Sequence, residues 1–297
     1  MERNLRGTYS VMVTAFDAKG RVDLERMAAY TEWQVTQGIH GLIPLGSTGE
    51  FLSMTDAERE SVARCVIDTV AGRVPVLIGT GSENTDDVVR YSQQAEALGA
   101  SGVMIIPPYY STPTEEELFE HYRRIAAAIS VPIMIYNNPA TANVDLTPPI
   151  VARLSTIEGV SYIKESTMDV TRVRDILDLC EGRMTVFGGI MGFESFMNGA
   201  QGWVAVGSNI MPRELARLFD LSVAGDIDGA RALYRQVLPV IRLVGGHRYV
   251  SATKSALAML GLPVGDPRPP RLPTPPAELD AVARALEAAG LSPTRTI

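Results

Sequence analysis

The chain has 297 residues, a formal net charge of −7 and two cysteines. Its 46% hydrophobic and 21% charged residues are an ordinary globular composition, and the acidic balance argues against nonspecific binding to nucleic acid or anionic membranes. Two cysteines cannot build a disulfide framework, and the sequence shows neither an apolar run of about 18 residues nor a signal-peptide pattern. We therefore expect a reduced, cytoplasmic protein without a membrane span.

Short apolar runs of about five residues recur along the chain, and such runs predict strands of a parallel sheet that is buried on both faces. The predicted strands are Tyr9–Val13, Gly41–Leu45, Val74–Gly79, Gly102–Ile106, Pro132–Tyr136, Val160–Lys164, Met184–Gly188 and Gly202–Val206.

A helix-length segment follows each run. Capping boxes at Thr55–Glu58 and Thr114–Glu117 mark two of the helix starts, and Pro148 after Thr147 marks a third. The predicted helices are Asp23–Gln37, one from the Thr55 cap to Ala71, Asn84–Leu98, Glu115–Ile129, one beginning at Pro148, Val170–Leu179, Phe193–Asn198 and Pro212–Ala224.

Eight strand-then-helix units in sequence predict an α/β fold, a (β/α)8 TIM barrel, over residues 1–224. A doubly wound sheet is the rival, but it rarely shows eight such even repeats. Residues 225–297 predict an appended C-terminal helical region, with a proline-rich connector at Asp266–Ala277. Its predicted helices are Asp226–Val244, Ser251–Leu260 and Ala277–Ala289.

Lysine is rare in this chain. Only three of the 27 basic residues are lysine, namely Lys19, Lys164 and Lys254. Lys164 lies at the end of an apolar predicted strand, where barrel enzymes place their chemistry. Its stem could pack while its ammonium reaches solvent. Alternatively, burial lowers the pKa of the amine, which is then a nucleophile toward a carbonyl group.

Other predicted strand ends carry hydroxyls, tyrosines and glycines. The turn Gly46–Gly49 offers backbone N–H groups and two hydroxyls, which suit a carboxylate or a phosphate, although an ordinary loop is the alternative. Tyr136 is a candidate proton shuttle or a packed rim residue, and Tyr109 and Tyr110 follow two prolines in a stiff loop.

Metal and nicotinamide sites are poorly supported. The three histidines are scattered, and no GxGxxG sequence follows a strand. We therefore expect neither a metal nor a cofactor.

Five motifs, in this order and spacing, resemble the dihydrodipicolinate synthase / N-acetylneuraminate lyase superfamily of Schiff-base pyruvate aldolases. The resemblance covers nearly the whole chain. The motifs are Gly46-Ser-Thr-Gly-Glu50, Pro75-Val-Leu-Ile-Gly-Thr-Gly81, Pro108-Tyr-Tyr110, Tyr136-Asn-Asn-Pro139 and Ile163-Lys-Glu-Ser166.

The resemblance implies a role for each site residue. Lys164 is similar to the imine lysine and Tyr136 to the acid/base tyrosine. Tyr110 is similar to a tyrosine that reaches a neighbouring subunit's site and joins a hydroxyl relay with Thr48, so the resemblance implies a homo-oligomer, at least a dimer and in the family a tetramer. Substrate-binding positions implied in the same way are Ser47, Thr48, Thr141, Ser166, Gly189 and Val204.

Thr141 departs from the synthase pattern, which has an arginine for a second carboxylate at this position. The segment Gly188–Gly192 also lacks the acids that the synthase and the lyase carry near the seventh strand. We therefore expect a lyase that cleaves a 4-hydroxy-2-oxo (2-keto-3-deoxy) acid reversibly to pyruvate and an aldehyde.

A 2-keto-3-deoxy sugar acid dehydratase that uses the same imine is the close alternative. A dihydrodipicolinate synthase is a further one and would need an arginine from elsewhere, such as Arg248. A non-catalytic binding protein on the same barrel is disfavoured because both Lys164 and Tyr136 are present.

Overall fold

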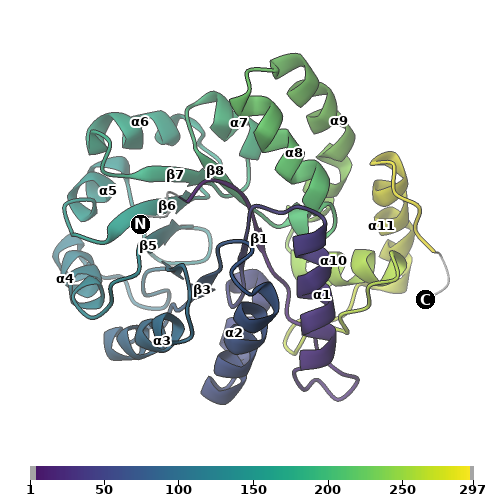
Figure 1. Ribbon diagram of the computed structural model, residues 1–297, viewed down its shortest axis with the longest axis horizontal. Coiled ribbons are helices and arrows are strands. Elements are labelled where there is room, and N and C mark those ends of the chain that lie inside the picture. Colours follow the sequence, from purple (N-terminus) through teal and green to yellow (C-terminus); the bar gives the residue numbers. More distant parts are fainter. Residues whose placement is uncertain (1–4, 295–297) are drawn as a thin grey trace. The chain divides into compact units, whose positions relative to one another are not determined.

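The computed structural model describes residues 5–294 of the chain. Within them, eight strands alternate with the helices α1 to α8, and every strand pair with a described register is parallel (Figure 1). This order confirms the predicted (β/α)8 TIM barrel with appended C-terminal helices. The strands are β1 (Gly7–Val11), β2 (Gly41–Ile43), β3 (Leu77–Gly79), β4 (Gly102–Ile105), β5 (Ile133–Asn137), β6 (Val160–Glu165), β7 (Thr185–Gly188) and β8 (Gly202–Ala205).

The helices begin close to their predicted starts because the capping chemistry is local. The side chains of Thr55 and Thr114 each accept a hydrogen bond from the backbone N–H three residues on, and Glu58 and Glu117 close both capping boxes. The barrel helices are α1 (Leu24–Thr36), α2 (Asp56–Val70), α3 (Thr85–Ala97), α4 (Glu115–Ala126), α5 (Pro148–Leu154), α6 (Thr171–Cys180), α7 (Gly192–Met197) and α8 (Pro212–Val223).

Some boundaries differ from those predicted. Strand β1 begins two residues before the predicted Tyr9, and α4 ends at Ala126, three residues before the predicted Ile129. Short 3₁₀ helices at Ser47–Gly49, Phe51–Ser53 and Gly207–Asn209 were not predicted. They occupy loops after β2 and β8, where a three-residue turn leaves no hydrophobic period to detect.

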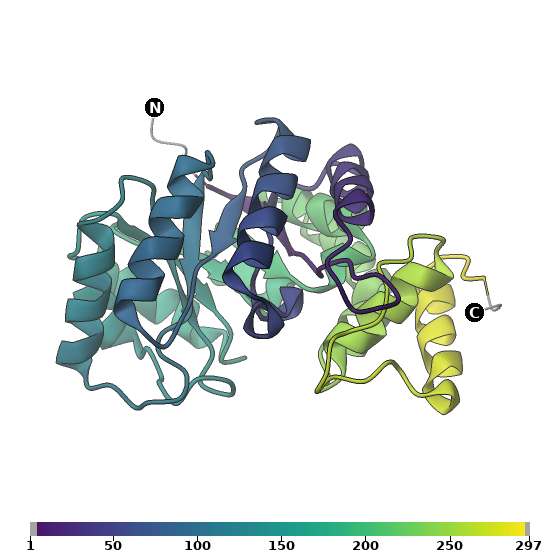
Figure 2. The same ribbon diagram turned by 90° about the horizontal axis from the view of Figure 1, so that it is seen from below.

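The described chain forms two compact units, and each is described by itself. One comprises residues 5–7 and Pro75–Val204, the other Thr8–Val74 and residues 205–294. In the first unit, strands β3 to β8 pair in sequence order, and the helices α3 and α4 lie side by side (Figure 2). The predicted boundary at residue 224 is not where these units divide, and a separate barrel and C-terminal region remain a prediction.

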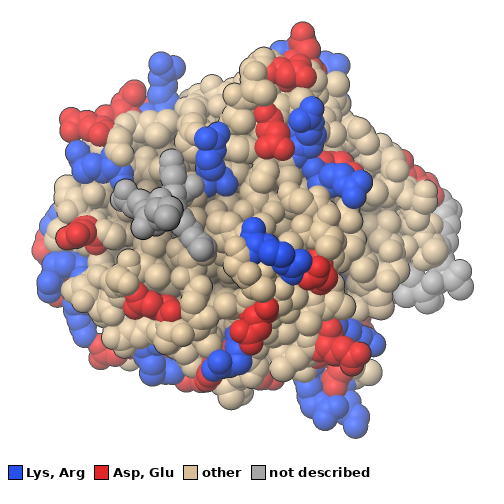
Figure 3. Space-filling view, in the orientation of Figure 1, with Lys and Arg blue, Asp and Glu red and all other residues tan. Residues whose placement is uncertain are grey.

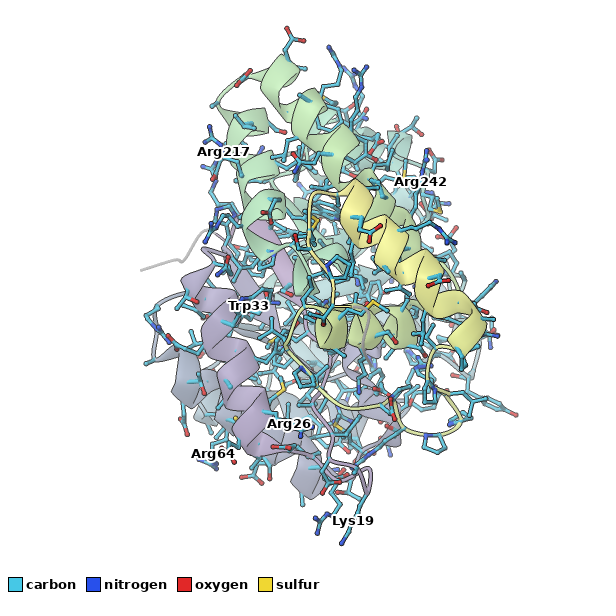
Figure 4. All side chains as sticks on the ribbon, turned by 90° about the vertical axis from the view of Figure 1, so that its right-hand side faces the viewer. Lys19, Arg26, Trp33, Arg64, Arg217 and Arg242 are labelled. Atoms are coloured by element: carbon cyan, nitrogen blue, oxygen red, sulfur yellow. The ribbon has the colours of Figure 1, made fainter. Side chains whose placement is uncertain are left out.

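In the second unit, β1 pairs with β2, and α1 packs on α2. The C-terminal helices are α9 (Ile227–Leu243), α10 (Tyr249–Met259) and α11 (Pro276–Ala288), and α11 packs against both α9 and α10 (Figures 2 and 4).

Basic side chains of this unit stand on its surface. Figure 4 labels five exposed ones: Lys19, Arg26, Arg64, Arg217 and Arg242. On the face shown in Figure 3, side chains of both charges are interspersed rather than gathered by sign. Among the described helices, none is long and apolar enough to cross a bilayer.

Candidate functional site

Lys164 and Tyr136 stand side by side on adjacent strands. The register of β5 and β6 pairs Tyr136 with Lys164, and register partners in a parallel sheet point to the same face. The Lys164 Nζ atom lies 3.9 Å from the centre of the Tyr136 ring. The fold thus brings together the two residues that the sequence singled out most strongly.

Burial gives Lys164 an unusual amine. The residue is only 6% exposed, and loss of hydration lowers the pKa of its amine from 10.5 to about 7. A lowered pKa increases the share of molecules that hold a neutral amine near neutral pH. A neutral amine has the lone pair that attacks a carbonyl carbon, whereas an ammonium group does not.

The neighbouring residues Asn137 and Glu165 point to the opposite face, because side chains alternate along a strand. The Asn137 Nδ2 atom donates to Glu165 Oε2 at 2.9 Å and to Asp145 Oδ1 at 3.2 Å, and Asn137 Oδ1 accepts from the Leu146 N–H. Arg172 donates two hydrogen bonds to the Asp145 carboxylate, at 2.6 and 2.8 Å. This network, buried at Asn137 and Glu165 and partly exposed at Asp145 and Arg172, holds the ends of β5 and β6 in place.

Ser166 follows β6 and is 5% exposed. Its hydroxyl is close enough to Tyr136 to oppose the rise in the Tyr136 pKa that burial causes. A β-carbon on Gly189 would stand 1.7 Å from the Ser166 oxygen, so only glycine leaves the Ser166 hydroxyl its place. The Gly189 N–H donates to the Glu165 carbonyl at 2.7 Å, which extends the pairing of β6 with β7.

The loop that carries Tyr110 is held by one carboxylate. Glu83 accepts the backbone N–H groups of Tyr109, Tyr110 and Ser111 at 2.9, 3.0 and 2.9 Å. Burial alone would raise the pKa of Glu83, but these bonds and one from the Ser111 hydroxyl hold it below its usual value. The Tyr110 side chain is 86% exposed, so this stiff loop presents an aromatic hydroxyl outward, away from its own unit. The sequence did not single out Glu83.

In the second unit, Ser47 and Thr48 form the short turn after β2. The turn lies between Leu45 and Glu50, which both adopt positive φ angles of about 60°. The Gly49 carbonyl accepts from the Thr14 hydroxyl at 2.8 Å, and a β-carbon on Gly49 would approach the Met12 carbonyl to 3.0 Å. Thr48 is buried, and Ser47 is partly exposed.

Glu50, at the end of this turn, is clamped by C-terminal residues. Its Oε1 atom pairs with Lys254 Nζ at 2.9 Å, with both side chains at most 3% exposed, and its Oε2 atom accepts the Arg268 N–H at 2.9 Å. The Lys254 ammonium also donates to the Asp266 carbonyl and lies 4.3 Å from the centre of the Phe16 ring. Arg268 donates to Glu58, which also caps α2.

Sequence reasoning missed this clamp, because it used the rarity of lysine for Lys164 alone. The same rarity applies to Lys254, which lies among alanine and leucine residues in α10. The pairing of Glu50 with Lys254 could not be predicted from chain position, because the two residues lie far apart in sequence.

Breaking the clamp on one side should be strongly destabilising. Lys254→Met leaves a buried carboxylate without its cation, and such a loss costs roughly 3–5 kcal/mol of the free energy of unfolding. The double variant Lys254→Met/Glu50→Gln removes both charges and should recover most of this loss. Urea unfolding measures both variants.

The matched control is Arg248→Met, which breaks the exposed pair of Arg248 with Glu278, of which the side chains are 56% and 52% exposed. It should change the free energy of unfolding by less than about 1 kcal/mol. A Lys254→Met variant as stable as this control would contradict the assignment of the clamp.

The remaining positions considered in the sequence analysis are Thr141, Val204 and Arg248. Thr141 is exposed, and its hydroxyl donates to the Asn138 carbonyl at 3.3 Å. Val204 is fully buried in β8. Arg248, considered as a substitute for the synthase arginine, donates to Glu278 at 2.9 Å. Within residues 5–294, no three His, Cys, Asp or Glu side chains gather in a way that could hold a metal ion.

Comparison with known proteins gives one consistent result. The profile of the dihydrodipicolinate synthetase family matches residues 4–289. The 4-hydroxy-tetrahydrodipicolinate synthase of Syntrophobacter fumaroxidans is 36% identical over 96% of this chain and 99% of its own.

Solved structures agree. The chloride-inhibited dihydrodipicolinate synthase of Acinetobacter baumannii, complexed with pyruvate, superimposes with a TM-score of 0.94 at 29% identity, over 97% of this chain and 100% of that one. A monomeric dihydrodipicolinate synthase variant gives a TM-score of 0.92 at 28% identity, over 97% of each chain.

Proposed function

Because the chain belongs to the dihydrodipicolinate synthetase family, a family of enzymes, we propose that Lys164 forms an imine with pyruvate or another 2-oxo acid. The observation that carries this proposal is the buried Lys164 amine, with its pKa near 7, 3.9 Å from the Tyr136 ring centre. The complex of the Acinetobacter relative with pyruvate supports the same class of substrate.

The imine supplies the electron sink for the reaction. Lys164 Nζ adds to the C2 carbonyl of the 2-oxo acid, and loss of water leaves a cationic iminium. In cleavage, the electrons of the C3–C4 bond flow into the iminium and form an enamine. Tyr136 takes the proton of the C4 hydroxyl as it passes its own proton to the neighbouring hydroxyl of the relay. Protonation of C3 and hydrolysis then release pyruvate and restore the amine. No step requires a metal or a cofactor.

The binding residues follow from the same proposal. The Ser47–Thr48 turn holds the carboxylate of the 2-oxo acid through its hydroxyls and N–H groups. Thr48 and Tyr110 complete the proton relay of Tyr136. Ser166 donates to the distal part of the substrate, with Thr141, Gly189 and Val204 at its border.

For the second substrate we propose an aldehyde without a carboxylate, so that the overall reaction is reversible aldol cleavage of a 4-hydroxy-2-oxo acid. The names of the relatives favour a second candidate, the 4-hydroxy-tetrahydrodipicolinate synthase reaction. Against it stands Thr141, a neutral residue at the position of the synthase arginine. A dehydratase would use the same imine to expel a β-hydroxyl group.

Borohydride trapping tests the imine. Borohydride added with pyruvate should reduce the imine and leave a mass gain on the Lys164 peptide alone, with full activity in EDTA. A panel of 2-keto-3-deoxy sugar acids, scored for pyruvate release against dehydration product, then separates aldolase from dehydratase. Labelling at Lys254 or Lys19 in place of Lys164 would overturn the mechanism.

We also propose that the enzyme is a homo-oligomer in which Tyr110 completes the site of a neighbouring subunit. Its 86% exposure on a loop held by Glu83 supports this proposal. Mixing inactive Lys164→Ala with Tyr110→Phe subunits should restore part of the activity, because some sites of a mixed oligomer then hold both intact residues. Absence of recovery after verified subunit exchange would place the action of Tyr110 within its own subunit.

A further inference from the structure

Asn138 contacts the hydroxyl group of Tyr136. Its Nδ2 atom donates to the Tyr136 oxygen at 2.9 Å, from a position two residues further along the chain. Tyr136 is 6% exposed and Asn138 is partly exposed, so the oxygen that accepts this bond is largely shielded from water. The motif Tyr136-Asn-Asn-Pro139 contains Asn138 but by itself assigns it no role.

The backbone holds Asn138 in place. Its carbonyl accepts the N–H groups of Thr141 and Ala142, both at 3.0 Å. Pro139 follows directly, and a residue before proline is restricted to extended conformations. The turn after β5 thus helps to set the position of the Asn138 amide, which is not set by the side-chain rotamer alone.

The bond from Asn138 uses part of the hydrogen-bonding capacity of the Tyr136 hydroxyl. A tyrosine hydroxyl has one proton to donate and two lone pairs that accept. An amide N–H occupies one lone pair, which leaves the proton and the second lone pair free for other groups. Burial raises the pKa of Tyr136, and the hydrogen bond from Asn138 and the nearby Ser166 hydroxyl oppose that rise.

We propose that Asn138 is a positioning residue for the proton-transfer step, in that its amide N–H fixes the Tyr136 hydroxyl and stabilises the oxygen when its proton is given away. The inference rests on the proposed role of Tyr136. A neutral donor suits a reversible reaction, because a cation in its place would hold the phenol as phenolate, and an apolar side chain would leave the buried oxygen with one partner fewer.

Two variants separate the hydrogen bond that Asn138 donates from the volume that its side chain fills. Asn138→Leu keeps the volume and removes the donor. Asn138→Asp keeps the shape, but its carboxylate can only accept and therefore repels a developing phenolate. The matched control is Asn198→Leu, which removes an amide that donates to the Glu194 carbonyl at 2.9 Å.

The first readout is the pH profile of the addition of pyruvate to the best aldehyde. Tyr136 acts there as an acid, so activity falls as its hydroxyl ionises. Loss of the donor raises the Tyr136 pKa, and we expect the alkaline limb of the Asn138→Leu profile to move up by about one pH unit. We expect kcat to fall about 10-fold, with the KM for pyruvate within about threefold of the parent value.

The Asp variant should move the limb further and lose more activity than the Leu variant, whereas the Asn198→Leu profile should not move. An unmoved limb in both Asn138 variants would overturn the proposal. So would an Asp variant as active as the parent enzyme, because the amide would then be acting as an acceptor.

The second readout needs no substrate. In protein labelled with ¹³C at tyrosine Cζ, the signal that Tyr136→Phe removes belongs to Tyr136. It should titrate at higher pH in Asn138→Leu than in the parent protein, and equal titration would contradict the proposal. Failure of borohydride trapping in the parent protein would instead contradict the proposed function. The tyrosine titration would still report whether Asn138 lowers the Tyr136 pKa, because it needs no substrate.

Discussion

Lys164→Ala should lose turnover by about 10⁴-fold or more and should not be labelled by borohydride with pyruvate. Without the amine there is no iminium to receive the electrons of the breaking bond. Tyr136 and the Ser47–Thr48 turn remain in the variant, so pyruvate binding should persist and can be measured by calorimetry. Residual turnover above one per cent would mean that Lys164 is not the nucleophile.

The pH dependence of trapping follows from the Lys164 amine. Its pKa near 7 means that the reactive neutral form grows as the pH rises from about 6 to about 8 and is nearly complete above that. The rate of imine formation, measured by stopped-flow in the parent enzyme, should follow this rise and then level off. A rise centred near pH 10 would show a solvated lysine instead.

The same buried amine should make the protein less stable than it would be without it. In the unfolded chain the pKa of this amine is near 10.5, and in the folded chain it is near 7, so between these values the unfolded state binds the extra proton. The free energy of unfolding therefore increases as the pH rises from about 7 to about 10.5. Lys164→Met should be more stable than the parent by a few kcal/mol at pH 7 and by little at pH 10.5.

Much of the fold was predictable because its signals are local. The eight apolar runs and the capping boxes at Thr55 and Thr114 each depend on residues close together in sequence. The structure contains a strand for each run and both capping boxes. The end of α4 was misplaced because alanine-rich sequence after Ala126 has strong helix propensity and lacks a stop signal.

The candidate site was predictable only in part. The position of Lys164 at a strand end follows from chain order, but its partner is set by the register of two strands, which pairs it with Tyr136. The bond from Asn138 depends on the turn geometry after β5, and the pairing of Glu50 with Lys254 depends on tertiary packing. Neither of these can be obtained from periodicity or composition.

The charge of the preferred second substrate should decide between the proposed aldolase reaction and the synthase reaction. A carboxylate taken into a partly buried site needs a charge-assisted hydrogen bond, which an arginine provides and Thr141 cannot. The loss of such a bond costs about two orders of magnitude in kcat/KM. The parent enzyme should therefore condense pyruvate with aspartate semialdehyde poorly and with neutral hydroxy-aldehydes better.

Thr141→Arg should move the preference toward the acidic aldehyde. Thr141 is exposed, and its hydroxyl bonds only weakly to the Asn138 carbonyl at 3.3 Å, so the larger side chain can extend without displacing buried groups. Thr141→Gln, a long neutral side chain, is the matched control and should not change the preference. The deciding quantity is the ratio of kcat/KM for aspartate semialdehyde to that for the best neutral aldehyde. A ratio well above one in the parent enzyme would reject the neutral-aldehyde assignment and establish the synthase reaction, since the site would then bind the second carboxylate without an arginine at position 141.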